Sequence, residues 1–283
     1  MGKLINNLAR WYFSGFPVEK GKWKIWVKVR PFLKMNGAER VQTTTNFGFR
    51  MNLDLSEHID KFIYYWGCWE PNETWVMEKI LRPGDTYVDI GAHIGYHSLL
   101  GAHFVGDTGE VIAFEPVPSS AEVFRKNLEL NSYKNIVLHE NAVSNQPGIV
   151  KIGKPSGTGS QNNTMRVDGD TSEFWEVAAK RLDDVLPADK PLRFIKIDVE
   201  GAELLVLKGF EKHLKAANPP FVLLEMNDKW IRQLGGSSEE LYNYMTSFGY
   251  KAYDCENLKF TPITFDDIPK DDLMDVMYSK EDL

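Results

Sequence analysis

Cysteines and long apolar runs are both scarce in this sequence. The 283 residues include two cysteines, Cys68 and Cys255, and neither belongs to a CxxC pair or lies at a spacing typical of metal ligands. This excludes a disulfide scaffold and indicates a reducing compartment, so we predict a cytoplasmic protein. No window approaches the roughly 18 uninterrupted apolar residues of a transmembrane helix. Residues 1–17 also lack the continuous apolar segment of a signal peptide.

An excess of positive charge is also absent. The chain has 33 lysines and arginines against 40 aspartates and glutamates, which gives a net charge of −7. This balance argues against a broad basic surface for nucleic acid, so we predict no nucleic-acid partner. Hydrophobic residues make up 43% and charged residues 26% of the chain, which excludes a wholly disordered or collagen-like protein.

Tryptophan is concentrated near the N-terminus. Six of the eight tryptophans lie in the first 80 residues, at Trp11, Trp23, Trp26, Trp66, Trp69 and Trp75. The residue pattern predicts an amphipathic helix at 4–16, a half-buried strand at 22–30, two strands within 41–55, and helices at 60–65 and 73–81. We interpret residues 1–80 as an extension on the substrate side of the protein. The basic, aromatic first helix suits packing on the protein's own core, docking to a membrane face or a glycosyltransferase, or a contact between two copies of the chain.

Strands alternate with helices from residue 82 onward. We predict strands at 86–90, 111–115, 136–139, 193–199 and 221–226, helices at 96–104, 119–131, 202–214 and 238–248, and short strands at 250–254 and 259–262. Ser119 or Ser120 is the expected cap of the second of these helices, and Ser237 or Ser238 that of the fourth. This alternation is typical of an α/β fold with an open, mostly parallel sheet and helices on both faces, here over residues 81–283.

The segment RPGDTYVDIGAHIGYHSL at residues 82–99 contains a turn between a strand and a helix. Ligands of open parallel sheets bind at such turns, where Gly91 lets the backbone approach and Gly95 lets the helix start close to the strand. A dinucleotide site has the spacing G-x-G-x-x-G, whereas this turn reads D-x-G-x-x-x-G with Asp89 first. A carboxylate there repels a pyrophosphate but suits a sulfonium or an amine, so the turn favours S-adenosylmethionine over NAD.

Further polar residues follow the later strands. Glu115, next to Pro116, ends the second strand, where a carboxylate can accept both ribose hydroxyls of an adenosine. Asn141 and Ala142 end the third strand near the expected adenine. Lys196, Asp198 and Glu200 alternate along the fourth strand and therefore share one face, and Glu225 ends the fifth strand. Burying a charged side chain inside a strand costs free energy, which indicates that these residues have a function.

In order along the chain, the segments RPGDTYVDIGAHIGYHSL, VIAFEPVPSSAEVFRKNLELN, NAVS, RLDDVL, IKIDVEGAE and LLEM resemble the FkbM family of S-adenosylmethionine-dependent methyltransferases. The resemblance covers residues 67–226. It implies a class I, Rossmann-like methyltransferase fold and methylation of hydroxyl groups, mostly on sugars or polyketide-type products. It also implies that Glu70, in Trp69-Glu70-Pro71, helps to hold the methionine end of the cofactor. His93 and His97 depart from the family's turn, and we expect the first to contact the cofactor and the second the substrate.

Methyl transfer to a sugar hydroxyl is helped by a base near the hydroxyl proton. We predict that Asp198 is this base and that Lys196 lowers its pKa or binds a substrate oxygen, with Glu200 or Glu225 as alternatives and His93 or His97 less favoured. Asp198 and Glu225 are also the residues that would hold Mg²⁺, but their spacing is no firm metal motif, and a metal requirement is not favoured.

The acceptor pocket is expected to involve the Gly- and Ser-rich loop at 153–170, with Ser160, Gln161 and Asn162, and the N-terminal tryptophans. These groups suit a carbohydrate. A lipid or natural-product acceptor is an open alternative. An NAD-dependent oxidoreductase is disfavoured by the glycine spacing, and a non-catalytic module by the intact acidic positions.

Overall fold

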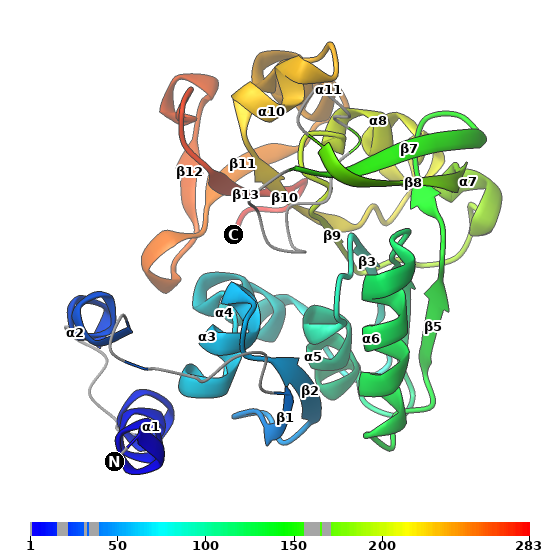
Figure 1. Ribbon diagram of the computed structural model, residues 1–283. Helices are drawn as coiled ribbons and strands as arrows, with labels where there is room; N and C mark the ends of the chain where they lie inside the picture. The colour runs from blue at the N-terminus through cyan, green and yellow to red at the C-terminus, as the bar shows by residue number, and fades with distance from the viewer. Residues whose placement is uncertain (1, 16–21, 31–32, 34–39, 156–164, 166–170) are drawn as a thin grey trace.

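The computed structural model describes residues 2–15, 22–30, 33, 40–155, 165 and 171–283 (Figure 1). The N-terminal helices are α1 (Gly2–Arg10), the π-helical turn η1 (Trp11–Gly15), α2 (Lys22–Val29), α3 (His58–Trp66) and α4 (Pro71–Ile80). The later helices are α5 (Tyr96–Val105), α6 (Pro118–Glu129), α7 (Leu182–Val185), α8 (Glu203–Lys208), α9 (Glu211–Leu214), α10 (Asp228–Gln233) and α11 (Ser238–Ser247), with 3-10 turns η4 (Glu256–Leu258) and η5 (Phe265–Asp267).

A central eight-stranded sheet organises the fold. Its spatial order is β12 (Thr261–Ile263), β11 (Lys251–Asp254), β13 (Met274–Ser279), β10 (Phe221–Met226), β9 (Phe194–Ile197), β3 (Thr86–Ile90), β4 (Glu110–Phe114) and β5 (Ile136–His139). The strands from β10 to β5 run parallel, whereas β13 lies antiparallel between β10 and β11. The predicted α/β class with a mostly parallel sheet is therefore confirmed. The chain reverses direction across the sheet between β3 and β9, which opens a crevice at the carboxyl ends of these strands.

Two smaller sheets flank the central one. The strands β1 (Arg40–Thr44) and β2 (Arg50–Asp54) form the predicted N-terminal pair. The strands β6 (Ala142–Val143), β8 (Thr171–Lys180) and β7 (Gly148–Pro155) form a second sheet beside the crevice. The β7–β8 hairpin and β13 were not predicted, and the start of the expected loop at 153–170 belongs to β7.

Side chains of the central strands alternate between two apolar layers. On β3, Val88 and Ile90 belong to a core cluster with α8, α10 and α11, whereas Tyr87 faces the cluster formed with α3, α4 and α5. Because successive strand residues point to opposite faces, Asp89 lies on the α4–α5 side. Lys196 on β9 lies beside Asp89, and Glu225 shares this face of the sheet, two residues beyond Leu223, the partner of Lys196 on β10. The sheet therefore presents its charged residues to one layer of helices.

Several sequence predictions of local structure were wrong. Residues 22–30, expected as a strand, form helix α2, in which Lys22 and Trp26, four residues apart, both have buried side chains. The helix expected at 202–214 is interrupted at Gly209, where a Cβ would lie 2.3 Å from the carbonyl oxygen of Ser144. Helix α6 is preceded by Val117 with Pro118 in its first turn, so neither predicted serine caps it.

Other predictions were confirmed. The strands predicted at 86–90, 136–139 and 221–226 have those bounds in the structure, and the Ser237 hydroxyl oxygen caps α11 by accepting a hydrogen bond from the Glu240 amide. The helix predicted at 4–16 is present as α1 and η1. Within the described parts of the chain, no helix has both the length and the apolar character that crossing a bilayer requires.

Candidate active site

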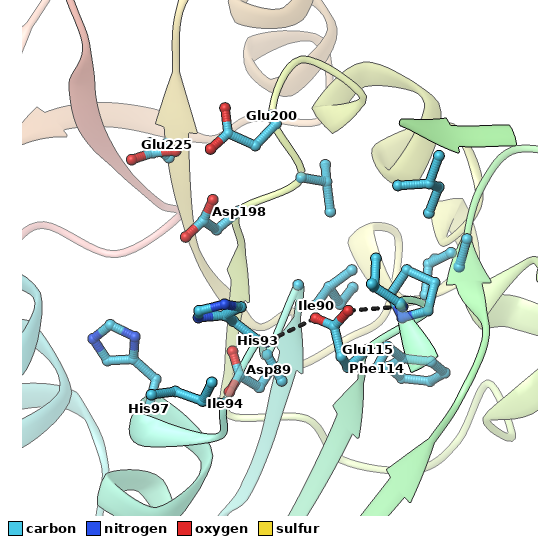
Figure 2. A pocket seen from close by; sticks show the side chains of 18 of the residues that line it. Asp89, Ile90, His93, Ile94, His97, Phe114, Glu115, Asp198, Glu200 and Glu225 are labelled. Carbon is cyan, nitrogen blue, oxygen red and sulfur yellow. Dashed lines mark hydrogen bonds between the residues drawn. The ribbon is translucent and has the colours of Figure 1, made fainter. Parts of the chain in front are cut away.

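A cavity of about 350 Å³ opens at the carboxyl ends of β3, β4, β9 and β10 (Figure 2). Most of the residues predicted for the site line it: Glu70, Asp89, Gly91, His93, His97, Glu115, Pro116, Asn141, Ala142, Asp198, Glu200 and Glu225. Two others lie outside this lining. Gly95 faces the ring of Phe124, 2.2 Å from where a Cβ would be, and Lys196 is buried behind Asp198. Ser160, Gln161 and Asn162 fall outside the described residues, although the nearby Met165 lines the cavity.

The turn after β3 is built around Gly91 and His93. Gly91 has a φ of 90°, and a Cβ there would lie 1.8 Å from the carbonyl oxygen of Asp198, so this turn and the end of β9 are in backbone contact. The His93 amide donates a hydrogen bond of 2.7 Å to Glu115 Oε2, and the Val117 amide donates one of 2.8 Å to Oε1 (Figure 2). Burial raises the pKa of Glu115 to about 7 despite these donors.

Three residues of the cavity wall have a strained backbone. Glu70, His93 and Glu200 have φ values of 44°, 48° and 53°. In the described part of the chain, two other non-glycine residues have positive φ, and neither lines the cavity. Because left-handed conformations of such residues persist only where the surrounding structure enforces them, they cluster at functional sites. This strain marks the cavity independently of the sequence motifs.

A buried cluster of charged groups lies beneath the cavity on the α4–α5 side of the sheet. Lys196 Nζ lies 2.9 Å from Asp198 Oδ2 and 3.3 Å from Glu73 Oε2. His97 Nε2 lies 3.3 Å from the same Glu73 oxygen and 3.7 Å from Glu70 Oε2. Lys196 and Glu73 are both almost fully buried, with side chains 3% and 2% exposed, so water would contribute little to stabilising a charge on either group.

Burial and neighbouring charges shift the pKa values of the groups in this cluster in different directions. Burial opposes the charge of Lys196, but the nearby carboxylates outweigh it and hold its pKa well above the ordinary value. Burial would likewise raise the pKa of Asp198, yet the Lys196 ammonium lowers it overall. Burial, with the neighbouring charge of Glu70, raises the pKa of Glu73 well above its ordinary range. Lys196 and Asp198 therefore form an ionised pair, whereas burial favours the protonated form of Glu73 beside them.

The carboxyl groups of Asp198, Glu200 and Glu225 converge on the opposite side of the cavity from Glu115 (Figure 2). One oxygen from each lies within 4.8 Å of the other two, as do the nearest atoms of Glu70, Glu73 and His97, so either group has a geometry that can hold a cation. Burial and the charge of Asp198 raise the pKa of Glu225 well above its ordinary value. Two neighbouring carboxyl groups with opposite pKa shifts are typical of an acid–base site.

Asp89 is held rather than free to rotate. Its Oδ2 accepts a hydrogen bond of 2.5 Å from the hydroxyl of Ser98, and its side chain reaches the cavity from the end of β3. His93 lies between Asp89 and Asp198 (Figure 2), and burial lowers its pKa to about 4. Its imidazole is therefore neutral near neutral pH.

The sequence analysis missed two members of the site. Glu73 was predicted only as the start of a helix, although it stands three residues after Glu70, the N-cap of α4, and both carboxyl groups lie near His97 Nε2. Asp275 was missed because β13 was missed. It lies opposite Glu225 in the β10–β13 ladder, and burial raises its pKa to about 6. The spacing of Glu70 and Glu73 was a usable signal, whereas Asp275 had none.

Replacing Gly91 with alanine tests the contact between the turn and β9. The control is Gly48→Ala, since Gly48 has a similar φ of 85° but a Cβ there would have no atom within 4 Å. We expect Gly48→Ala to cost roughly 1–2 kcal/mol from backbone strain alone. Gly91→Ala should cost clearly more, because its Cβ would overlap a backbone oxygen, and it should abolish ligand binding in the cavity. Urea unfolding and titration calorimetry measure both effects, and equal losses in the two variants would contradict this reading of the turn.

Comparison with known proteins assigns the chain to a family. The family described as the methyltransferase FkbM domain matches residues 89–252, more than half of the chain. The sequence is 26% identical over 201 residues to "Methyltransferase 1" of Beauveria bassiana, covering 61% of this chain and 76% of that protein. It is 38% identical over 58 residues to protein-L-isoaspartate O-methyltransferase 1 of Archaeoglobus fulgidus, covering 20% of this chain and 27% of that enzyme.

Similar solved structures include TYW2 of P. horikoshii in complex with MeSAdo, with a TM-score of 0.44, 15% identity and coverage of 88% of this chain and 74% of that one. Fibrillarin of Aeropyrum pernix with bound S-adenosyl-L-methionine has a TM-score of 0.40, 9% identity and coverage of 73% and 72%. The family match spans the glycine turn, Glu115 and the charged end of β9. The chain belongs to the FkbM family of S-adenosylmethionine-dependent methyltransferases.

Proposed function

We propose that this methyltransferase acts on a hydroxyl oxygen, and that the acceptor is a sugar in a glycan or glycoconjugate. The observation that carries the proposal is the ion pair at 2.9 Å between Asp198, which lines the cavity, and Lys196, which is buried behind it. It keeps a carboxylate ionised inside a largely apolar pocket, where a hydroxyl proton needs an acceptor.

The cavity residues fit the cofactor. Glu115 uses each oxygen for one backbone donor and keeps further lone pairs, which suit the two ribose hydroxyls. The carboxyl groups of Asp89, Glu70 and Asp198 line the wall, and carboxyl oxygens suit a sulfonium and an α-amino group. We assign Glu70 to the methionine end, and Pro116, Asn141 and Ala142 to the adenine end, where the Asn141 amide is oriented by its bond of 3.0 Å to the Ala142 carbonyl oxygen.

When bound, S-adenosylmethionine supplies an electrophilic methyl group, and the residues of this chain orient the acceptor and take its proton. Asp198 Oδ1 or Oδ2 accepts the hydroxyl proton. Glu225, kept neutral by its surroundings, acts as a hydrogen-bond donor beside Asp198. Asp198, Glu200 and Glu225 converge closely enough to hold a cation. Lys196 already supplies a positive charge next to the base, however, so we expect turnover to survive chelation of divalent cations.

Aromatic side chains at the cavity favour a carbohydrate acceptor. Trp69 and Trp230 both contribute to its lining, and indole faces stack on sugar rings. A lipid or natural-product hydroxyl is the alternative acceptor, because apolar residues such as Ile59 and Leu273 also line the cavity. The test is a methyl-transfer screen over sugars, glycolipids and polyketide-type alcohols with labelled cofactor. Transfer to nitrogen acceptors alone would contradict the proposal.

Cofactor affinity should depend on pH through Glu115. Its pKa is about 7, and the ribose hydroxyls need the carboxylate form as their acceptor. Below this pKa, binding must first remove a proton, so affinity for S-adenosylhomocysteine should fall by up to roughly tenfold per pH unit as the pH decreases, and level off above it. Titration calorimetry of the wild type and of Glu115→Gln checks this, with NADH as the ligand that should not bind. A pH dependence that persists in Glu115→Gln would assign the proton to another group.

A further inference from the structure

Positive charge is segregated at the N-terminus of this acidic chain. Nine of its 33 basic residues and two of its 40 acidic residues lie in the first 40 positions. This segment therefore carries a net positive charge, although the whole chain has a net charge of −7. The methyltransferase site does not use this charge, since every basic group described above at the cavity comes from other elements.

The helices of this segment also expose apolar side chains. Leu8 and Trp11, three residues apart across the α1–η1 junction, are 57% and 61% exposed. Ile25 and Val27 on α2 are 41% and 42% exposed, between the exposed Lys24 and Lys28. These six residues form what we call the N-terminal patch. Helices α1 and α2 lie together at one edge of the molecule, outside α3 (Figure 1).

The opposite sides of these helices are firmly packed. Phe13 stacks on Trp66 with ring centroids 5.2 Å apart, and Trp26 meets Phe62 of α3 edge to face at 5.9 Å. Helices α1 and α2, with the turn η1, are therefore fixed to the rest of the protein by their buried aromatic residues. The N-terminal patch is the face that they turn away from it. These helices bury one apolar face and expose a second face that is both basic and apolar. Such an exposed face is typical of a surface that binds a partner or a membrane.

The aromatic packing continues from this element to the cavity. Phe62 lies parallel to Trp66 at 5.0 Å and meets Trp69 at 5.3 Å, and Trp69 lines the cavity. The N-terminal element therefore packs on Phe62 and Trp66, and Phe62 in turn contacts Trp69 of the cavity wall.

We infer that the N-terminal patch docks this enzyme on an anionic lipid bilayer. Lysines beside exposed aliphatic and indole side chains on short helices match the interfacial mode of membrane binding, in which the apolar groups enter the headgroup region and the ammonium groups meet lipid phosphates. A nucleic acid would use the lysines but gain nothing from Leu8, Ile25 and Val27. The inference concerns where the enzyme works and does not depend on which hydroxyl it methylates.

Vesicle sedimentation with the full-length chain tests this inference. The probe is vesicles of phosphatidylcholine with about one quarter phosphatidylglycerol, compared with phosphatidylcholine alone. We expect binding to the anionic vesicles that weakens roughly tenfold or more between about 0.1 and 0.5 M salt, because the lysine contribution is screened. No sedimentation with anionic vesicles at low salt would overturn the inference.

Two pairs of matched variants locate the bound surface. The patch variants are L8S/W11S and K24E/K28E, and their controls, which change the same number of exposed residues elsewhere, are I149S/F174S and K259E/K270E. Each patch variant should reduce vesicle binding at least tenfold, while the controls bind like the wild type and all four keep the wild-type circular dichroism spectrum. If the controls lose as much binding as the patch variants, or if the chain binds RNA or a protein but not vesicles, the patch is not a membrane-docking surface.

Discussion

Replacing Asp198 with asparagine is expected to lower kcat by about 10²–10⁴-fold while leaving the fold intact. Asparagine has the same shape but cannot take the acceptor's proton. Because the pKa of Asp198 lies below its ordinary value beside Lys196, the wild-type enzyme holds this base ready throughout the neutral range. The measurement is the pH profile of kcat with an identified acceptor, since loss of the base should also remove the acid limb of that profile.

Glu225→Gln is the matched control for this substitution. Burial and the charge of Asp198 raise the pKa of Glu225, which favours its protonated form, and a glutamine amide donates a hydrogen bond much as a protonated carboxyl does. We therefore expect a much smaller loss for Glu225→Gln than for Asp198→Asn. The opposite ranking, with Asp198→Asn near normal and its pH profile unchanged, would transfer the role of base to Glu225 or Glu200.

Removing the Lys196 ammonium should have the largest effect on stability. In Lys196→Met, the partly buried Asp198 carboxylate loses its counter-charge, and breaking a buried ion pair in this way costs about 3–5 kcal/mol. The control is Lys190→Met, whose partly exposed ion pair with Glu110 should contribute less than about 1 kcal/mol. Urea unfolding of the two variants measures the difference.

The pH dependence of the Lys196→Met variant separates electrostatics from packing. Without the ammonium, the folded-state pKa values of the buried carboxyls rise above their unfolded values. Such groups stabilise the fold at low pH and lose that contribution as the pH rises, so the destabilisation should be smaller near pH 5 than near pH 8. The acid limb of the kcat profile should move to higher pH in the same variant. A destabilisation that is independent of pH would mean that Lys196 contributes packing alone.

Local sequence patterns were sufficient to predict those elements whose conformation is set by their own residues. The strands at β3, β5 and β10 and the glycine turn were predicted because alternating apolar residues and a glycine with positive φ have few other structural solutions. Helix α2 was mistaken for a strand, because its apolar and basic residues alternate. Its helical state is decided by Trp26, which packs into the rings of Phe62 and Tyr65.

The sequence by itself determined the family, the cofactor turn and most of the charged and polar residues that line the cavity. All three depend on particular residue types at fixed distances from the ends of strands, and such distances can be read directly from the sequence. Only the tertiary structure decided which carboxyl groups are ionised and which other elements join them. Glu73 reaches Lys196 from α4, and Asp275 reaches Glu225 from a strand about 50 residues further along the chain, because the order of strands in the sheet brings them together. Protonation depends on burial and on neighbouring charge in three dimensions, and neither is encoded in local spacing.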